Sequence, residues 1–443
     1  TGDEQAAWDS LEELEELLET AGAEASSMLV QNLEHPDRAT YIGSGKVLEV
    51  KEMLAQQDAV GIVCDDELSP SQVRNLSDRL ESKVLDRTLL ILDIFAAHAK
   101  TKEGKIQVEI AQLKYRSSRL RGWGEALSRL GGGIGTRGPG ETKLETDRRV
   151  IQRRIKILSD EIDAMKRVRD TTRKKRSASM IPTLAIVGYS NAGKSTLLNC
   201  LTEADVLSED KLFATLDPTT RTAVLPDGQQ VLMTDTVGFI NKLPHHLVDA
   251  FRSTLEEAKY ADVILHVIDA SNPQAELQRK VALATLEDLG VVGKPVITAW
   301  NKMDKVETKM EEGLWPETDE GLWPPEDQGG LWPSEDQAGL WPPEDQVGRG
   351  PCEDQGGLWP SAAFRDFEAD ASVQISALTG EGIPELYEAI AHILGENRVY
   401  LETVLDYKDS GKLAQIRKYG QLLEEKYEGD GIHIKAYVPR SLV

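Results

Sequence analysis

Gly188-Tyr-Ser-Asn-Ala-Gly-Lys-Ser-Thr196 is the stretch that decides the fold of this 443-residue chain. The apolar run Leu184-Ala-Ile-Val187 precedes it and Leu197-Leu-Asn-Cys-Leu201 follows it, which is the order of a strand, a glycine loop and a helix. The stretch fits G-x-x-x-x-G-K-[ST], the phosphate loop, whose glycines let successive backbone N–H groups face a polyphosphate at a helix N-terminus. The predicted phosphate-binding residues are Gly188, Tyr189, Ser190, Asn191, Ala192, Gly193, Lys194, Ser195 and Thr196.

Two side chains of this loop carry the chemistry that a nucleotide requires. Lys194 can reach the β- and γ-phosphates, and the Ser195 hydroxyl can bind Mg²⁺. A second strand-like run, Val231-Leu-Met-Thr234, ends in Asp235-Thr-Val-Gly238. A carboxylate there can hold the Mg²⁺ shell, and a glycine N–H can meet the γ-phosphate. We therefore add to the nucleotide site Asp235, Thr236, Val237 and Gly238.

Two further strand ends predict which base the site reads. Pro295-Val-Ile-Thr-Ala-Trp300 ends in Asn301-Lys302-Met-Asp304, where the Asp304 carboxylate can accept from the two N–H groups that guanine presents and adenine lacks. Asn301 can brace that loop. The run Val373-Gln-Ile-Ser376-Ala377-Leu378 offers a backbone N–H to the guanine oxygen. Each short motif alone could be a surface turn, but four in this order at strand ends predict a GTP site.

The composition sets limits on the class of protein. The length is sufficient for about three domains. No run of 18 apolar residues occurs, so we expect no membrane association. The chain begins with Thr1 rather than Met, which we interpret as a fragment or a processed form, and a removed targeting peptide remains open. Cys64, Cys200 and Cys352 lack metal-binding spacing, which favours free thiols in a reducing compartment.

The net charge of −24 hides segments of opposite character. Residues 100–176 carry 22 Lys and Arg against 10 Asp and Glu, a balance of +12. Residues 311–360 carry 13 acids and one base. The average charge argues against nucleic-acid binding, but the basic segment favours it.

Residues 1–99 are predicted to form a small α/β domain. Leucines at helical spacing between residues 11 and 18 indicate an amphipathic helix, with further helices near 46–57 and 70–81. Strand-like runs occupy 27–31, 59–64 and 83–85. Gly43-Ser-Gly-Lys46 resembles half a phosphate loop, but the first glycine is absent and a turn that opens the next helix explains it.

Residues 100–178 are predicted to form a helical hairpin. Apolar residues recur at helical spacing over 105–121 and again from Leu144 to about Arg176, around a tip with six glycines in residues 131–140. The tip could be a loose linker, or it could approach RNA, where backbone must come close and basic flanks neutralise phosphates. The bases of those flanks are Arg148, Arg149, Arg153, Arg154 and the run 173–176.

Residues 179–396 alternate strands and helices, as in a doubly wound parallel sheet. Within them, 311–363 repeat Gly-Leu-Trp-Pro units with acids between them, a composition that we expect to be a disordered insert because each unit offers a single Leu-Trp pair for a core. The tryptophans could instead be docking sites. Residues 397–443 have strand, helix and strand patterns and are expected to form a small appended α/β unit.

With these stretches laid out, the chain resembles the HflX family of translational GTPases over nearly its full length. The resemblance rests on the phosphate loop and on four other stretches: Tyr41-Ile-Gly-Ser-Gly-Lys46, Gly131-Gly-Gly-Ile-Gly-Thr-Arg-Gly-Pro-Gly-Glu-Thr142, Leu212-Phe-Ala-Thr-Leu-Asp-Pro-Thr219 and Asp235-Thr-Val-Gly-Phe239. It implies that the N-terminal domain and hairpin, through residues 100–178, dock on the large ribosomal subunit and its rRNA, with the tip towards the peptidyl-transferase centre. GTP binding would then favour separation of stalled ribosomes.

The resemblance also implies a first switch made of Phe213, Ala214, Thr215, Leu216 and Asp217. Thr215 would be the second protein ligand of Mg²⁺; spacing alone leaves Thr215, Thr219 and Thr220 open. Lys194, Thr215 and Gly238 would then support catalysis. Phe239 has no amide to orient an attacking water, so hydrolysis should be slow without help from elsewhere. His245 and His246 are candidates for that help, although switch histidines are more often inert.

Two other functions remain open at this stage. One is a GTP-gated rRNA-binding or assembly protein, and the other is an ATP-driven RNA remodeller, against which Asn301 and Asp304 argue. The chain is expected to be a monomer. The expected location is the cytoplasm, or the chloroplast stroma or mitochondrial matrix if the chain is a processed eukaryotic form.

Overall fold

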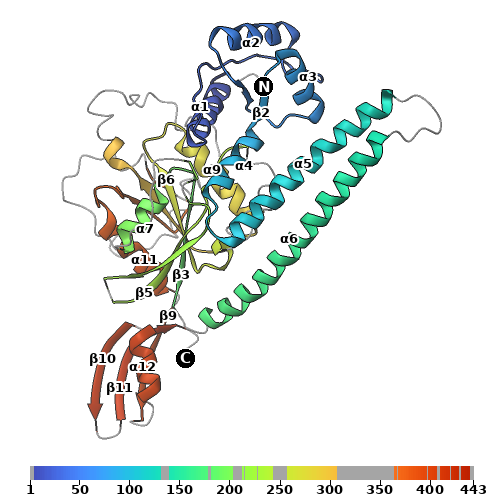
Figure 1. Cartoon of the computed structure of the whole chain (residues 1–443). Helices are drawn as coiled ribbons and strands as arrows, with labels where there is room; N and C mark the ends of the chain where they lie inside the picture. Colours follow the sequence, from blue (N-terminus) through green and yellow to red (C-terminus); the bar gives the residue numbers. More distant parts are fainter. Residues whose placement is uncertain are drawn as a thin grey trace, which may run out of the picture.

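A computed structural model shows a central six-stranded sheet flanked by an N-terminal domain, a projecting hairpin and a small C-terminal sheet (Figure 1). It describes residues 4–130, 139–177, 181–202, 212–213, 215–226, 228–242, 257–306, 364–366, 368–396, 398–406, 410–419, 421–428 and 431–439. The glycine-rich tip at 131–138, the insert at 311–363, Ala214, His245 and His246 lie outside these residues. Among the described helices, none is both long and apolar enough to cross a membrane.

The N-terminal domain packs helices around a two-stranded parallel sheet. Its elements are α1 (Glu4–Thr20), α2 (Ser44–Gln56), β1 (Gly61–Cys64), α3 (Pro70–Leu80), β2 (Lys83–Asp86) and α4 (Arg87–His98). Gly43 precedes α2, so the half phosphate loop is a helix start, as predicted. Residues 27–31 do not form the strand that their apolar character suggested, because no strand within the described residues pairs with them. Helix α4 was not predicted; its buried face is almost continuous, which hides the helical period.

The hairpin consists of α5 (Lys102–Leu130) and α6 (Pro139–Ser177), which run side by side away from the sheet (Figure 1). Both helices were predicted, and α6 ends within a residue of the expected place. Salt bridges join the first two turns of α5 to α6: Lys102–Glu161, Arg154–Glu109 and Arg169–Glu103.

The central sheet has the strand order β4-β5-β3-β6-β7-β8. Its strands are β3 (Thr183–Gly188), β4 (Thr219–Val224), β5 (Gln230–Asp235), β6 (Val263–Asp269), β7 (Val296–Asn301) and β8 (Ala371–Gln374). Five strands are parallel, but β4 is antiparallel to β5, so the sheet is mixed rather than wholly parallel. Only residues 225–229 join β4 to β5, and a parallel crossover requires a much longer connection.

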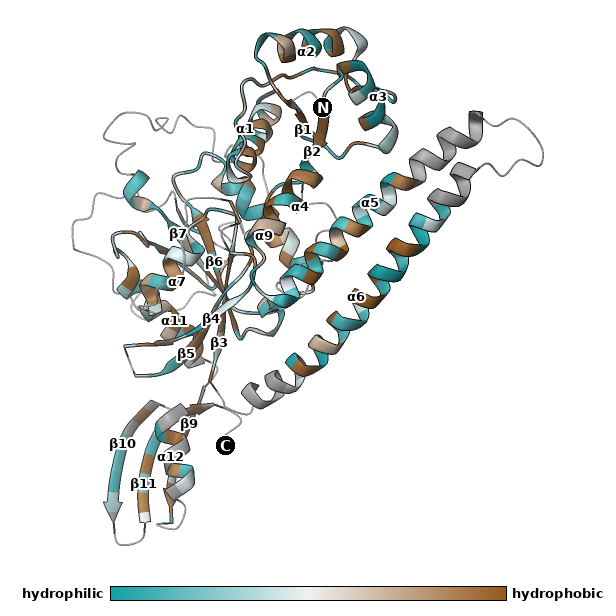
Figure 2. Cartoon of the chain, viewed as in Figure 1, coloured by the Kyte–Doolittle hydropathy of each residue, from teal (hydrophilic) through white to brown (hydrophobic). Residues whose placement is uncertain are grey.

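Helices cover both faces of this sheet. One face packs on α7 (Lys194–Thr202) and α11 (Ile383–Glu396), and the other packs on α9 (Ala275–Asp288). The second face also shares a single apolar core with α1, α4 and α5, through residues such as Leu17, Ile91 and Ala111. Figure 2 shows the mainly apolar strands at this centre and the mostly hydrophilic residues in the coloured part of α6. The N-terminal domain therefore packs directly on the domain that contains the central sheet.

The C-terminal unit is an antiparallel sheet of order β10-β11-β9 with one helix against it. Its elements are β9 (Arg398–Leu405), α12 (Ser410–Tyr419), β10 (Gln421–Glu428) and β11 (Gly431–Pro439). Strand β10 was not predicted from the sequence. Its run QLLEEKYE carries charges at adjacent positions, so the alternation typical of a half-buried strand is missing.

Candidate active site

The phosphate loop connects the end of β3 to the start of α7, as its motif predicts. Gly193 has φ +91°, and a Cβ atom there would lie 2.2 Å from Asn301 Nδ2. Only glycine fits this position, because both the backbone conformation and the space exclude a side chain. Asn191 also lies in the left-handed region, with φ +60°. The loop thus curls tightly against the loop that follows β7.

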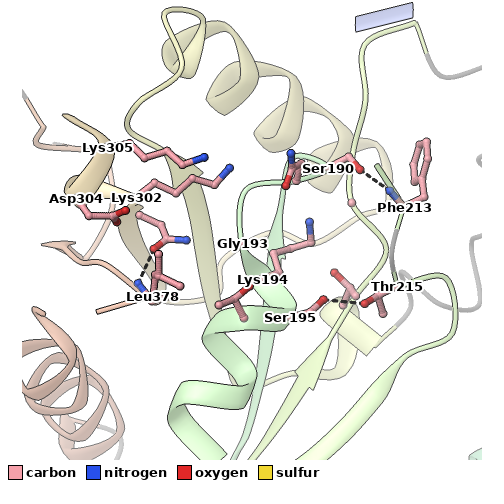
Figure 3. Close-up of a pocket in the computed structure, with 16 residues that line it drawn as sticks. Ser190, Gly193, Lys194, Ser195, Phe213, Thr215, Lys302, Asp304, Lys305 and Leu378 are labelled. Carbon is pink, nitrogen blue, oxygen red and sulfur yellow. Dashed lines mark hydrogen bonds between the residues drawn. The ribbon is translucent and has the colours of Figure 1, made fainter. Parts of the chain in front are cut away.

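A cavity of about 360 Å³ opens beside this loop, within the size range of ligand-binding sites (Figure 3). It lies at the carboxyl ends of β3 and β7, where ligands of open α/β sheets bind. The described residues that line it are Ser190, Asn191, Gly193, Lys194, Ser195, Thr196, Phe213, Thr215, Thr236, Gly238, Asn301, Lys302, Asp304, Lys305, Ala377 and Leu378.

Most of the residues predicted for the nucleotide site therefore meet around one cavity. Gly188, Ala192, Asp235 and Ser376 lie outside its lining but within the same loops. Four others are directed elsewhere: the side chains of Tyr189, Leu216 and Val237 are buried in the core shared with the N-terminal domain, and Asp217 binds the start of α5. Lys305 lines the cavity without having been predicted; its only signal in the sequence is that it follows Asp304.

Lys194 is buried at the base of the cavity, with 6% of its surface exposed. Its Nζ donates to the Tyr189 carbonyl oxygen at 2.7 Å. Burial lowers the pKa of Lys194 to about 8, and the nearby Asp235 carboxylate opposes this shift. A bound phosphate would favour the charged form of the Lys194 ammonium as the Asp235 carboxylate does, so the site is suited to an anion.

Three side-chain oxygens converge next to Lys194. Ser195 Oγ lies 2.7 Å from Thr215 Oγ1 and donates to Asp235 Oδ2 at 2.7 Å. Asp235 Oδ1 is buried and has no hydrogen-bond partner within the described part of the chain. Hydroxyl and carboxylate oxygens are the donors that Mg²⁺ prefers, and a buried, unpaired carboxylate oxygen is the group that a cation shell satisfies. This set of oxygens fits Mg²⁺.

The predicted base-reading loops are joined by Asn301, which is 2% exposed. Its Nδ2 donates to the Ala192 carbonyl at 2.8 Å, and its Oδ1 accepts from the Ala377 N–H at 2.9 Å. One side chain thereby ties the phosphate loop to the loop after β8. Asp304 Oδ1 accepts from Ser376 Oγ at 2.6 Å, and Lys302 forms a 2.7 Å ion pair with Asp269.

Comparison with known proteins agrees with this geometry. Three family models match: GTP-binding GTPase N-terminal over residues 8–96, GTP-binding GTPase Middle Region over 98–176 and 50S ribosome-binding GTPase over 183–302. The GTPase HflX of Lacrimispora saccharolytica is 52% identical over 442 residues, which cover 100% of this chain and 92% of that protein. The chain belongs to the HflX family of GTPases.

A second HflX protein and a solved structure also match this chain. The GTPase HflX of Caldanaerobacter subterraneus subsp. tengcongensis is 44% identical and is matched over 97% of this chain and 87% of its own length. The solved structure is the crystal structure of a GTP-binding protein from the archaeon Sulfolobus solfataricus in complex with GDP. Its sequence is 24% identical to this chain, and the match has a TM-score of 0.41 and covers 88% of this chain and 96% of that protein's chain. The predicted resemblance to the HflX family and the prediction of a P-loop GTPase are thus confirmed.

The segment that follows β5 in this HflX-family GTPase is hydrogen-bonded to the phosphate loop through the backbone of Phe239. Phe239 N donates to the Gly188 carbonyl at 3.1 Å, and Ser190 N donates to the Phe239 carbonyl at 2.7 Å. The Phe239 side chain is 2% exposed and lies in the core shared with the N-terminal domain. Gly238 is so close to Ser190 that a Cβ atom would lie 2.6 Å from Ser190 Cα. Phe239 is therefore directed away from the cavity.

Proposed function

We propose that this GTPase binds the large ribosomal subunit and uses GTP binding and hydrolysis to separate stalled ribosomes. The observation that carries the proposal is the basic hairpin, which projects from the GTPase domain while its first helix begins beside the first switch (Figure 1). The family model over residues 183–302, described as a 50S ribosome-binding GTPase, supports the same partner.

The charge of the hairpin suits a phosphate backbone. On α6, the side chains of Arg148, Arg153, Lys156 and Arg167 are exposed. By contrast, Arg154 is bound to Glu109 by two hydrogen bonds of 2.7 and 3.1 Å. Exposed bases on a projecting helix can neutralise rRNA phosphates, and each such contact makes the affinity more sensitive to salt.

The proposed chemistry is the attack of water on the γ-phosphate, without a covalent intermediate. Ser195, Thr215 and Asp235 would hold Mg²⁺, which when bound neutralises charge on the phosphate oxygens. Lys194 would bind the β- and γ-phosphates, and the Gly238 N–H would meet the γ-phosphate. The Asp304 carboxylate would bind the guanine N–H groups.

Hydrolysis by the free protein is expected to be slow. The residue after Gly238 is Phe239, and its side chain is buried in the core, so this position offers no polar group to orient the attacking water. On this proposal, the bound ribosome supplies or positions that group.

The test is the GTP hydrolysis rate with and without large subunits, together with light scattering of whole ribosomes. Stimulation of hydrolysis together with loss of the whole-ribosome signal is the expected result. Replacing Arg148, Arg153 and Lys156 with Gln should weaken both effects, whereas Arg154→Gln, at the base paired with Glu109, should weaken them less. A rate unchanged by subunits would refute the ribosomal proposal. Binding to naked rRNA without splitting would favour the assembly factor.

A further inference from the structure

The first switch is held on both sides of Thr215, by the phosphate loop and α4 on one side and by the start of α5 on the other. On one side, the Phe213 N–H donates to Ser190 Oγ at 2.8 Å, and the Phe213 ring packs edge-on against Phe95 of α4 with centroids 4.6 Å apart. Phe213 and Leu216 are 2% and 3% exposed. Thr215 is thus flanked by two residues buried against other elements.

On the other side, Asp217 binds the first turn of the hairpin. Its Oδ2 accepts from the N–H groups of Lys100 at 2.9 Å and Thr101 at 2.7 Å, and its Oδ1 accepts from the Thr101 hydroxyl. Thr101 Oγ1 in turn accepts from the Gly104 N–H at 3.0 Å. The carboxylate therefore lies at the positive end of the 29-residue helix α5, where a negative charge is favourable.

The fit between Asp217 and α5 depends on a glycine. A Cβ atom at Gly104 would lie 2.5 Å from Asp217 Oδ1 and 3.2 Å from Thr101 Oγ1. Alanine is ordinarily preferred to glycine inside a helix. Glycine at this buried position keeps open the space that the switch carboxylate occupies.

We propose that Asp217 is a positioning residue for GTP hydrolysis, which holds Thr215 in the metal site by fixing the first switch to the start of the hairpin. Only Leu216 lies between Thr215, whose hydroxyl contacts Ser195, and Asp217, whose carboxylate is bound at the start of α5. A shift at either residue therefore reaches the other. Displacement of the hairpin by a partner would then move Thr215. The proposal rests on the assigned role of Thr215 but does not depend on the ribosome.

The expected effects distinguish positioning from general stability. GDP lacks the γ-phosphate, so its affinity should not depend on how Thr215 is held. In Asp217→Ala, the affinity for a non-hydrolysable GTP analogue in Mg²⁺ and the kcat for GTP should both fall about tenfold, the size of one hydrogen bond to a charged group. The Mg²⁺ concentration needed for half-maximal analogue binding should rise.

Two other variants test the same contact from either side. Asp217→Asn keeps one acceptor oxygen and should show a smaller loss. Gly104→Ala leaves the charge intact but displaces the carboxylate, so it should reproduce the loss in analogue affinity although it is remote from the nucleotide. The matched control is Asp262→Ala: Asp262 Oδ2 also accepts from a threonine, from the N–H of Thr183 at 2.7 Å and its hydroxyl at 2.9 Å, but outside the switches.

Thermal unfolding of every variant accompanies the binding measurements. Parent-like analogue affinity and kcat in both Asp217→Ala and Gly104→Ala would overturn the proposal, as would equal losses of GDP and analogue affinity. Thr215→Ala separates the assumption that Thr215 is a metal ligand from the assumption that Asp217 positions Thr215. If Thr215→Ala binds the analogue as the parent does, the role of Thr215 is wrong; if it loses affinity while Asp217→Ala does not, only the positioning role of Asp217 fails.

Discussion

Asn301→Ala should lower the affinities for GTP and GDP equally, because it removes a buried side chain that joins the phosphate loop to the loop after β8. The change leaves the Ala192 carbonyl and the Ala377 N–H without the partners that they have at 2.8 and 2.9 Å. Leaving a buried polar group unpaired costs about 1–3 kcal/mol, so the two together cost about 2–6 kcal/mol. In the free variant the two loops can relax so that water hydrates these groups. Nucleotide binding must then restore the loop geometry at this cost, so the affinity for either nucleotide should fall between about 30-fold and about 10⁴-fold.

The measurement is a fluorescence titration of each variant with labelled GDP and with a labelled, non-hydrolysable GTP analogue. Neither bond of Asn301 involves the groups assigned to the γ-phosphate, so the ratio of the two affinities should stay that of the parent. Asn75→Ala is the control: Asn75 Nδ2 donates to the Ala39 carbonyl at 2.9 Å, but that bond is exposed, and its loss should change neither affinity. A GDP affinity of Asn301→Ala within threefold of the parent would refute the reasoning.

Three further predictions concern the base, the pH and the insert. Asp304→Asn should shift the base preference from guanine towards xanthine nucleotides in competition assays. If the variant rejected xanthine nucleotides as strongly as the parent does, the assignment of Asp304 as the base-reading carboxylate would be wrong. Burial lowers the pKa of His266 to about 4 from 6.5, so the unfolded chain binds a proton at a higher pH than the folded chain does. The free energy of unfolding, measured in urea, should therefore fall by up to ~3 kcal/mol between pH 6.5 and pH 4. His266→Gln should remove this loss. Deleting 314–360 should preserve folding and GTP affinity, because Val306 and Phe364 on either side lie in one cluster; an unfolded product would show that the repeat packs.

Much of the candidate site could be predicted from short stretches of sequence. The phosphate loop, the residues after β5 and the loop at Asn301 each depend on residue types at fixed spacing, and the structure places them around one cavity. Local sequence patterns predicted strands less well, because a segment forms a strand only where another strand pairs with it. Residues 27–31 resemble a strand but pair with no strand in the described part of the chain, whereas β10 lacks the pattern of a strand and is paired along its length with β11.

The sequence by itself determined that this chain binds a nucleotide with a phosphate loop, because the conformation of that loop follows from glycines and neighbours a few residues apart. Only the tertiary structure decided what surrounds the switches. Asp217 meets Thr101 across 116 residues, and Phe239 enters a core with α1 and α4. Such contacts arise from the packing of distant segments, which leaves no periodic signal at either residue, and they are the means by which the N-terminal domain and hairpin contact the nucleotide site.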